Sequence, residues 1–419
     1  MKKPKSTTDN KSAQTISIRG IFLQFLKIGA IAFGGPAAHA GLMEHELVTR
    51  KKWITVQSLL DYIGAVNLIP GPNSTQLTML VGYKLRGWRG MVAGGFGFII
   101  PAAVITVILA VVYVRLGEVP AIESLFYGIK PAVIAVIAGA IYKMGKKAFK
   151  NIWLGMLGVI VLGANLLGLN EIMAILGAGI AGMTFYAIRR GFRSGSDDKS
   201  HGDSEGNDRS SLLSSLFRRL RGGKNTHALA PFVLLQATVV AVTQYSTLKL
   251  FWIFFKIGAL LFGTGYVLVA YMDGELVEKA GWLTREQLLD AIAIGQFTPG
   301  PILSAATFTG YLLEGWTGAI VATMGIFLPS FAFILLLYPL IPRLRKSPYT
   351  ANFLDSVNMG AVAVMLAVSI QMGFEVVADW GTALILGLGL LVAFSRRKPG
   401  AVWIILGGAL LGLLLNMLF

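Results

Sequence analysis

Apolar stretches of membrane-spanning length recur from one end of the chain to the other. A spanning helix needs about 20 largely apolar residues. Such stretches lie near residues 20–42, 56–83, 88–114, 121–142, 151–168 and 170–188, and then near 229–247, 250–271, 286–312, 316–341, 352–374, 377–394 and 400–418. The pattern predicts an all-α polytopic membrane protein.

A polar segment divides the chain. Residues 191–228 are rich in Gly, Ser and charged side chains, a composition typical of a disordered tether. Part of it, 210–221, could instead form a basic amphipathic helix on an anionic leaflet. We therefore expect four parts: a helical region 1–190, a linker 191–228, a single extra helix 229–248 and a second helical region 249–419.

Composition narrows the class further. Only 14% of the residues are charged and 55% are apolar, whereas soluble proteins carry about 25% charged residues. Soluble enzymes and nucleic-acid-binding proteins are therefore poor candidates, despite a net charge of +16. The absence of cysteine excludes disulfides, thiolate metal sites and cysteine nucleophiles. The polar first 17 residues precede no cleavage site, so the stretch from Ile21 is expected to be retained.

Clusters of Lys and Arg set the expected orientation. They lie near residues 84–89, 143–150 and 189–193 in the first half, and near 343–346 and 396–398 in the second. Positively charged loops stay in the cytoplasm. The pattern places the N-terminus and the linker in the cytoplasm and the C-terminus outside.

The two helical regions are copies of each other. Residues 25–72 align with 254–301 without a gap, and 20 of these 48 positions are identical. The chain is therefore a tandem duplication of about six helices, with 229–248 as an extra helix between the copies. An odd number of crossings before the second copy would invert it, and the basic loops agree. We expect inverted-topology repeats, which let a site at mid-membrane face either side alternately.

Two breaks in each copy attract attention. Gly34-Gly35-Pro36 is mirrored at Gly263, and Pro70-Gly71-Pro72 is mirrored by Pro299-Gly300-Pro301. Pro and Gly interrupt a helix, and the next helix then offers unpaired N–H groups and partial positive charge. These breaks predict a site for an anion. The pieces that flank them are short, so each could also be one arm of a re-entrant hairpin. The other expected substrate-binding residues are Lys27, His39, Asn73, Ser74, Thr75, Gln76, Lys256 and Ser304.

Charged residues inside apolar segments complete the picture. Lys27 and Lys256 are candidate counter-charges for the anion, although lysines also extend to the headgroups. Four carboxylates recur between the copies, and they could carry protons or simply pair with nearby cations: Glu46, Asp61, Glu275 and Asp290. Ile302-Leu303 replaces Asn73-Ser74 in the second copy, so we expect the first copy to hold most of the anion contacts.

Enzyme motifs are missing from the sequence. There is no Walker A loop, no His-Glu-x-x-His helix and no Gly-x-Ser-x-Gly elbow. With four histidines, two of them in the linker, a metal site is not expected, and neither is a cofactor.

The breaks and their neighbours resemble the chromate ion transporter family. The resemblance rests on Phe33-Gly-Gly-Pro with His39, Glu46 and Trp53, on Pro70-Gly-Pro with Gln76 and Gly82-Tyr83, and on their copies in the second half. It implies a long two-domain member, in the bacterial plasma membrane, that exports chromate and confers chromate resistance. The resemblance also implies that sulfate is recognised as a look-alike of chromate. Thr264 and the long linker depart from the family pattern.

Three functional hypotheses remain open at this point. The first is a secondary transporter of a tetrahedral oxyanion that works by alternating access. The second is a passive anion channel, or a transporter of another oxyanion such as sulfate. The third, a membrane enzyme that acts on a phosphate-bearing lipid, lacks any motif. The expected partners are the oxyanion and the lipid bilayer, and a homodimer is an open alternative for the assembly.

Overall fold

The computed structural model describes residues 16–116, 120–194, 246–262, 265–395 and 400–418. The chain forms two compact units, residues 1–185 with 245–419, and residues 186–244. In the second unit only 186–194, the end of helix α7, is described. The predicted helix 229–248, except for its last residues, and most of the linker lie outside the described residues, as do Gly263 and Thr264.

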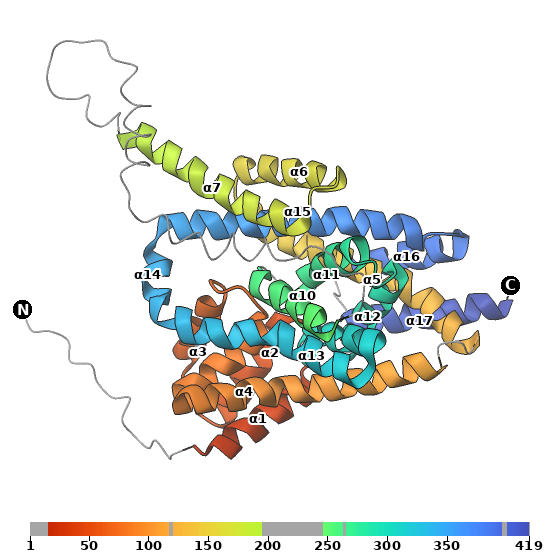
Figure 1. Cartoon of the computed structure of the whole chain (residues 1–419), viewed down its shortest axis with the longest axis horizontal. Coiled ribbons are helices and arrows are strands. Elements are labelled where there is room, and N and C mark those ends of the chain that lie inside the picture. The colour runs from red at the N-terminus through yellow and green to blue at the C-terminus, as the bar shows by residue number, and fades with distance from the viewer. Residues whose placement is uncertain (1–15, 117–119, 195–245, 263–264, 396–399, 419) are drawn as a thin grey trace, which may run out of the picture. The chain divides into compact units, whose positions relative to one another are not determined.

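Every described element is a helix (Figure 1). The first half contains α1 (Ile18–Ile31), α2 (Pro36–Met43), η1 (Glu44–Arg50), α3 (Val56–Val66), α4 (Asn73–Leu116), α5 (Pro120–Ala148), α6 (Ile152–Leu166) and α7 (Glu171–Ser194). The second half contains α10 (Thr247–Leu260), η4 (Gly265–Val267), α11 (Leu268–Met272), η5 (Asp273–Lys279), α12 (Arg285–Phe297), η6 (Ile302–Ser304), α13 (Ala305–Leu337), η7 (Tyr338–Leu340), α14 (Ile341–Lys346), α15 (Pro348–Val376), α16 (Trp380–Ala393) and α17 (Ala401–Leu418).

The repeat predicted from the sequence is visible in the helix boundaries. Ile18–Ile31 returns as Thr247–Leu260, a shift of 229 residues, and Pro120–Ala148 returns as Pro348–Val376, a shift of 228. Even the short π-helix η1 has its copy in η5. The duplication therefore extends through the whole of each half.

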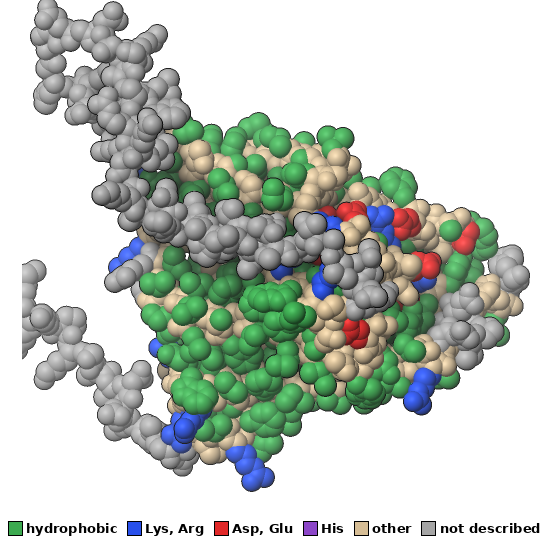
Figure 2. Space-filling model, viewed as in Figure 1, with side chains coloured by type: hydrophobic (Ala, Val, Ile, Leu, Met, Phe, Trp, Pro, Cys, Tyr) green, Lys and Arg blue, Asp and Glu red, His purple; other side chains and the backbone are tan. Residues whose placement is uncertain are grey.

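Five helical segments are long and apolar enough to cross a membrane: Asn73–Leu116, Ser124–Ala148, Glu171–Arg190, Ile302–Leu340 and Pro348–Val376. Hydrophobic side chains cover most of the described surface visible in Figure 2. Ile108, Leu336 and Leu391 are among the exposed large apolar residues. An apolar surface of this extent suits lipid, and the chain is a multi-pass, all-α membrane protein.

The longest helix of each half folds back on itself. The backbone leaves helical geometry at Gly87, where φ is +61°, and again at Gly315, where φ is also +61°. A side chain at Gly82 would overlap the Gly90 carbonyl, so the two arms of α4 pack at backbone distance. Each helix thus joins a short arm, 73–85 or 305–313, to a long arm.

Reciprocal contacts interlock the two halves. The Gly71 N–H donates to the Leu261 carbonyl over 2.6 Å, and the Gly300 N–H donates to the Ala32 carbonyl over 2.8 Å. These two bonds involve equivalent residues with the halves exchanged, as a pseudo-two-fold axis requires. Helix α5 packs on α16 and α17, while α15 packs on α6. The long arms of α4 and α13 contact each other and run in opposite directions (Figure 1).

Candidate functional site

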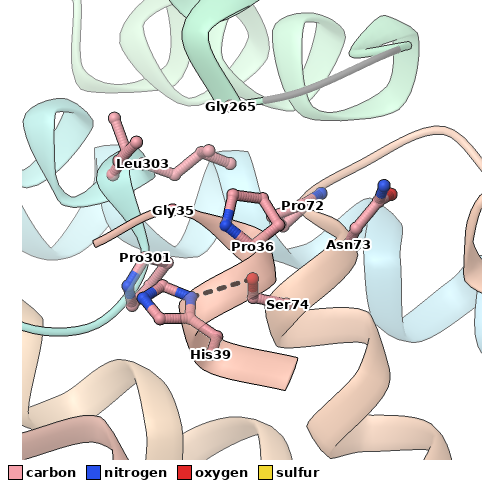
Figure 3. A pocket seen from close by; sticks show the side chains of 10 residues that line it. Gly35, Pro36, His39, Pro72, Asn73, Ser74, Gly265, Pro301 and Leu303 are labelled. Carbon is pink, nitrogen blue, oxygen red and sulfur yellow. Dashed lines mark hydrogen bonds between the residues drawn. The ribbon is translucent and has the colours of Figure 1, made fainter. Parts of the chain in front are cut away.

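The four predicted breaks meet at one small cavity. Its lining comes from the N-terminal ends of α2, α4, η4 and η6 (Figure 3). The lining residues are Gly35, Pro36, His39, Pro72, Asn73, Ser74, Gly265, Pro301, Ile302 and Leu303. Segments more than 200 residues apart in sequence therefore contribute to one site.

Helix α2 starts at the cavity because of its Gly-Gly-Pro sequence. Gly34 has φ = +101°, a conformation that disfavours other residues, and it turns the chain after α1. Gly35 is the N-cap and Pro36 the first helical residue, where the missing N–H of proline costs nothing. No side chain caps this helix. Pro36 has no N–H, and the N–H groups of Ala38 and His39 donate to the Gly35 carbonyl, so the Ala37 N–H is the donor that this helix start can offer to a ligand.

Helix α4 starts beside it by the same logic. Gly71, with φ = +123°, joins the two prolines, and its N–H is bound to Leu261 in the other half. The helix begins at Asn73, directly after Pro72. In the second half the equivalent Pro301 has an extended backbone and directly precedes η6. The Asn73 amide donates to Asn67 over 2.9 Å. Asn73 and Ser74 both line the cavity, and the Ser74 hydroxyl points toward His39 (Figure 3).

The second half lines the cavity with apolar side chains, whereas the first half lines it with polar ones. Ile302 and Leu303 line the cavity at the positions of Asn73 and Ser74. Ser304 is buried, and its hydroxyl lies 2.9 Å from that of Thr298. Among the lining residues that the structure describes, none is Lys or Arg. The groups in the lining that could attract an anion are therefore the helix N-termini, the Ser74 hydroxyl and His39.

His39 connects the two polar sides of the cavity. Its side chain is only 2% exposed. Nε2 lies 3.1 Å from the Ala32 carbonyl, which can only accept, so Nε2 carries a proton. Nδ1 lies 2.9 Å from Ser74 Oγ, as the dashed line in Figure 3 marks. The Ala32 carbonyl also accepts from Gly300, so the histidine is fixed to the junction of the two halves.

The cavity has a volume of about 20 Å³, room for a single water molecule. A tetrahedral oxyanion is several times larger. Binding such an ion therefore requires the lining segments to separate. The lining segments begin at Gly and Pro residues, and α4 contributes its short arm, which the break at Gly87 separates from the long arm.

Several predicted site residues lie behind the lining. Thr75 and Gln76 are fully buried, and Gln76 donates from Nε2 to the Pro70 carbonyl over 2.5 Å. Pro70, Gly71, Pro299 and Gly300 are buried in the two loops, and Gly34 is exposed beside the cavity. These residues shape the breaks. Gly263 lies outside the described residues.

Lys27 and Lys256 form ion pairs. Lys27 Nζ lies 2.6 Å from Glu46 Oε1, and Lys256 binds Glu275 in the second half. Each carboxylate has a further basic partner four residues later, Arg50 or Lys279. Neither Lys27 nor Lys256 lines the cavity.

The π-helices η1 and η5 explain this geometry. A π-turn carries one extra residue, which changes the direction of the side chains that follow. It turns Glu46 toward α1, where Gln24 also donates to it over 2.9 Å. η1 lies outside the candidate spans. The hydrogen bond from Lys27 and the other donors lower the pKa of Glu46 to about 2.

Asp61 and Asp290 occupy different environments. Asp61 is exposed on α3 and accepts from Gln57 over 3.5 Å. Asp290 is 4% exposed on α12, accepts from Tyr113 over 2.8 Å, and has no hydrogen-bond partner at Oδ1. The equivalent aspartates of the two copies therefore differ in burial and in hydrogen bonding.

Sequence reasoning missed some of these contacts. It did not find the His39–Ser74 hydrogen bond, because the two residues are 35 positions apart. It also missed Tyr113 as the partner of Asp290, and Gly265 as part of the lining. The mirrored break at Phe262–Gly265 was the signal available for Gly265. Among the described residues, no cluster of His, Asp or Glu could hold a metal ion.

Comparison with known proteins adds an independent line of evidence. The Chromate transporter family matches residues 19–183 and 248–413, one segment in each half. The chain is 29% identical over 407 residues to a chromate transport protein of Cupriavidus metallidurans, covering 96% of this chain and 94% of that protein. It is 29% identical over 399 residues to the chromate transport protein of Pseudomonas aeruginosa, covering 94% and 91%.

An uncharacterized transporter of Methanocaldococcus jannaschii is 28% identical over 400 residues, covering 95% of this chain and 94% of that protein. No solved structure matches the chain. The two matched segments coincide with the two copies seen in the helix boundaries. The chain therefore belongs to the chromate transporter family, as a long form with two copies of the family's unit.

Proposed function

We propose that this protein is a secondary transporter that exports chromate from the cytoplasm and so confers chromate resistance. The observation that carries the proposal is the convergence of the breaks of both halves at one cavity. The start of α2, which no side chain caps, and the start of α4 meet there with Ser74 and His39. Such groups suit a tetrahedral oxyanion with several acceptor atoms.

The binding site comprises both breaks of each half. The first half supplies the donors, at residues 34–36, 39 and 73–76. The second half supplies a matching surface, at residues 263, 299–301 and 304. Lys27 and Lys256 contribute positive potential and approach the anion when the segments separate. The protein has no catalytic site, cofactor or metal in this scheme.

Alternating access follows from inverted repeats. The reciprocal bonds of Gly71 and Gly300 support a pseudo-two-fold relation between the halves. The opposite directions of the long arms of α4 and α13 support an axis in the membrane plane. The short arms α3 and 73–85 then form a re-entrant hairpin whose tip is the Pro-Gly-Pro loop. The extra helix 229–248 would reverse the second half.

The same topology sets the orientation in the plasma membrane. The N-terminus and the linker lie in the cytoplasm, as does the basic stretch 343–346, and the C-terminus lies outside. A single cysteine at position 345 tests this arrangement, because the natural chain has none. Labelling of that cysteine only from the outside of intact cells would contradict the inverted arrangement.

The membrane potential can drive export. A negative charge leaving a negative-inside cell gains about 2.3 kcal/mol per 100 mV. No nucleotide-binding motif is present in the sequence. Glu46 and Glu275 act as structural ion-pair partners in this scheme, and coupling through a carboxylate is left to the buried Asp290.

The test is chromate and sulfate uptake into everted vesicles. We expect chromate uptake that saturates, shows counterflow and stops when both potential and pH gradient collapse. A passive channel would show neither saturation nor counterflow. Sulfate uptake without chromate uptake would assign the site to another oxyanion.

The two halves supply a matched control for the site. Ser74→Ala with Thr75→Ala should weaken chromate uptake about tenfold or more, since a hydrogen bond to a charged group contributes about 1.5–3 kcal/mol. Ser304→Ala should change uptake far less, because its hydroxyl faces Thr298. Equal effects of the two changes would count against an anion site built by the first half.

A further inference from the structure

His39 and Ser74 hold the only imidazole–hydroxyl contact among the described lining residues. Nε2–H is committed to the Ala32 carbonyl, so neutral His39 has a lone pair on Nδ1. That lone pair accepts the Ser74 hydroxyl proton. In this state Ser74 presents only oxygen lone pairs to the cavity, and these repel an anion.

Protonation reverses the hydrogen bond. When Nδ1 takes up a proton from water, it becomes a donor, and Ser74 Oγ becomes the acceptor. The Ser74 hydroxyl then no longer donates to the imidazole ring, and its hydrogen can rotate to point into the cavity. One proton taken up therefore creates one hydrogen-bond donor and one positive charge at the place where an anion binds.

We propose that the His39–Ser74 pair is a proton-dependent anion donor, so that one proton binds with each oxyanion and travels with it. The inference rests on the proposed function and specifies its coupling. A dianion accompanied by one proton still carries net negative charge outward, the direction that the membrane potential favours.

The second half supports the assignment by contrast. His39 corresponds to Leu268 and Ser74 to Leu303, so both members of the pair are replaced by leucine in the other copy. The second copy therefore folds around the same cavity without the pair, its helix starts taking the form of the short 3-10 turns η4 and η6. The pair occurs in the half that supplies the polar lining.

Among the described lining residues, His39 is the one side chain that can take up a proton at neutral or acidic pH. Around His39, α1 contributes the Ala32 carbonyl, and α4 contributes Ser74 and the edge-to-face ring of Phe98 at 5.6 Å. The lining residues of η4 and η6 do not titrate, and Tyr266 of η4 is a phenol that carries no charge at neutral pH. Of the charges of α1 and η1, Lys27 and Arg50 both pair with Glu46, and Arg19 is exposed at the start of α1. Glu44 and His45 of η1 are exposed.

The experiment measures chromate affinity against pH for the purified wild-type protein, His39→Gln and Ser74→Ala. The amide introduced by His39→Gln can still donate to the Ala32 carbonyl but cannot take up a proton. Chromate itself is a base, so its own titration contributes the same slope to every protein. We expect the wild-type affinity to rise more steeply on acidification than that of His39→Gln, by up to tenfold per pH unit.

Proton uptake gives the same quantity directly. In weakly buffered solution, chromate should cause the wild-type protein to bind up to one proton more than His39→Gln does. Ser74→Ala should still bind chromate more tightly on acidification, because His39 remains, but it should lose about tenfold in affinity at low pH, the effect of one hydrogen bond to an anion. A purely structural role for His39 would change affinity without changing the slope.

Each result decides the matter. Equal pH slopes in the wild type and His39→Gln, with chromate bound by both, would overturn the inference and leave the transporter intact. A wild-type protein that neither binds nor transports chromate or sulfate would overturn the proposed function itself. Should the variant fail to fold, the imidazole NMR signal of His39 in the wild type must still shift its titration to higher pH when sulfate or chromate is added.

Discussion

The two halves of this transporter share their helix boundaries but differ in what covers them. Leu60 of α3 is 56% exposed, whereas its counterpart Leu289 of α12 is 1% exposed. Helix α12 packs against α5 and α17, and α11 packs against α15. In the first half, α3 packs against α4 and η1. One broken segment is thus enclosed by the outer helices and its copy is not.

Charge reinforces this difference. Arg285 of α12 binds Asp273 over 3.0 Å and Glu375 of α15 over 2.6 Å. The residue that corresponds to Arg285 in the first half is Val56, which is exposed. The comparison teaches that a duplicated scaffold can place its two copies in unlike states. Alternation between inward and outward access needs such an inequality, since equal halves would expose the site to both sides alike.

Both halves share the junction made by the backbone bonds of Gly71 and Gly300. Substitutions at this junction should have the largest effects. We expect Gly71→Ala to abolish transport. Its methyl group would overlap the Gln76 amide and lie 2.7 Å from Ser330 Oγ, at a φ of +123°. Backbone strain of this kind costs about 1–3 kcal/mol before any overlap is counted. Thermal unfolding of the detergent-extracted protein measures the loss of stability, and chromate uptake measures the loss of transport.

Gly300→Ala should be damaging but milder, because its methyl group would meet the Ala102 methyl at 2.9 Å. Gly41→Ala is the control, since nothing lies within 4 Å of the added group. Wild-type stability in Gly71→Ala would show that the reciprocal junction does not hold the halves together.

The unequal packing leads to a second prediction: during transport the two halves exchange their packing arrangements. Lys130 of α5 lies 3.3 Å from Glu286 of α12. By the repeat shifts of 228 and 229, the equivalent pair is Asn358 of α15 and Gln57 of α3. We expect a bifunctional thiol reagent to link cysteines at 130 and 286 and to stop transport, because the link fixes the packing seen here.

Cysteines at 57 and 358 should also be linked, but only in protein that is free to cycle. The natural chain has no cysteine, so each pair can be studied alone. Transport that continues while 57 and 358 never react would mean that Arg285 fixes the inequality permanently and that the halves do not exchange roles.

Much of this arrangement follows from the sequence. The duplication is readable because 20 of 48 aligned residues are identical, and the breaks are readable because Pro and Gly end helices in any context. The enclosure of α12 and the exposure of α3 are not readable. They depend on helices more than 100 residues away, and α3 and α12 have similar local patterns. The His39–Ser74 contact was hidden for the same reason.

A third prediction uses the unlike aspartates. Asp290→Ala should lower stability by about 1–3 kcal/mol, since it leaves the Tyr113 hydroxyl buried without its acceptor. Asp61→Ala should change stability by about 0.5 kcal/mol or less, as surface substitutions usually do. Asp290→Asn keeps an acceptor for Tyr113. If it loses transport at wild-type stability, the carboxylate carries a proton; if it transports normally, the residue is structural.

The smallest effects are expected at the ion pairs that both halves retain. Lys27→Met removes one partner of Glu46 and leaves Arg50, so we expect less than about tenfold loss of transport, in keeping with the about 0–1 kcal/mol of an exposed pair. Lys256→Met should be somewhat more harmful, because Lys256 is 25% exposed against 42% for Lys27.

The double variant Lys27→Met with Glu46→Gln separates the two roles proposed for this lysine. If Lys27 only neutralises Glu46, removing both charges together should restore most of the transport that Lys27→Met loses, because no unpaired carboxylate is left. If Lys27 also meets the anion when the segments separate, the double variant should remain impaired and show a raised KM for chromate at unchanged stability. The equivalent double variant in the second half is Lys256→Met with Glu275→Gln. If this variant regains transport and the first-half variant does not, only Lys27 reaches the anion. The two halves would then differ in function even at the ion pair that both retain.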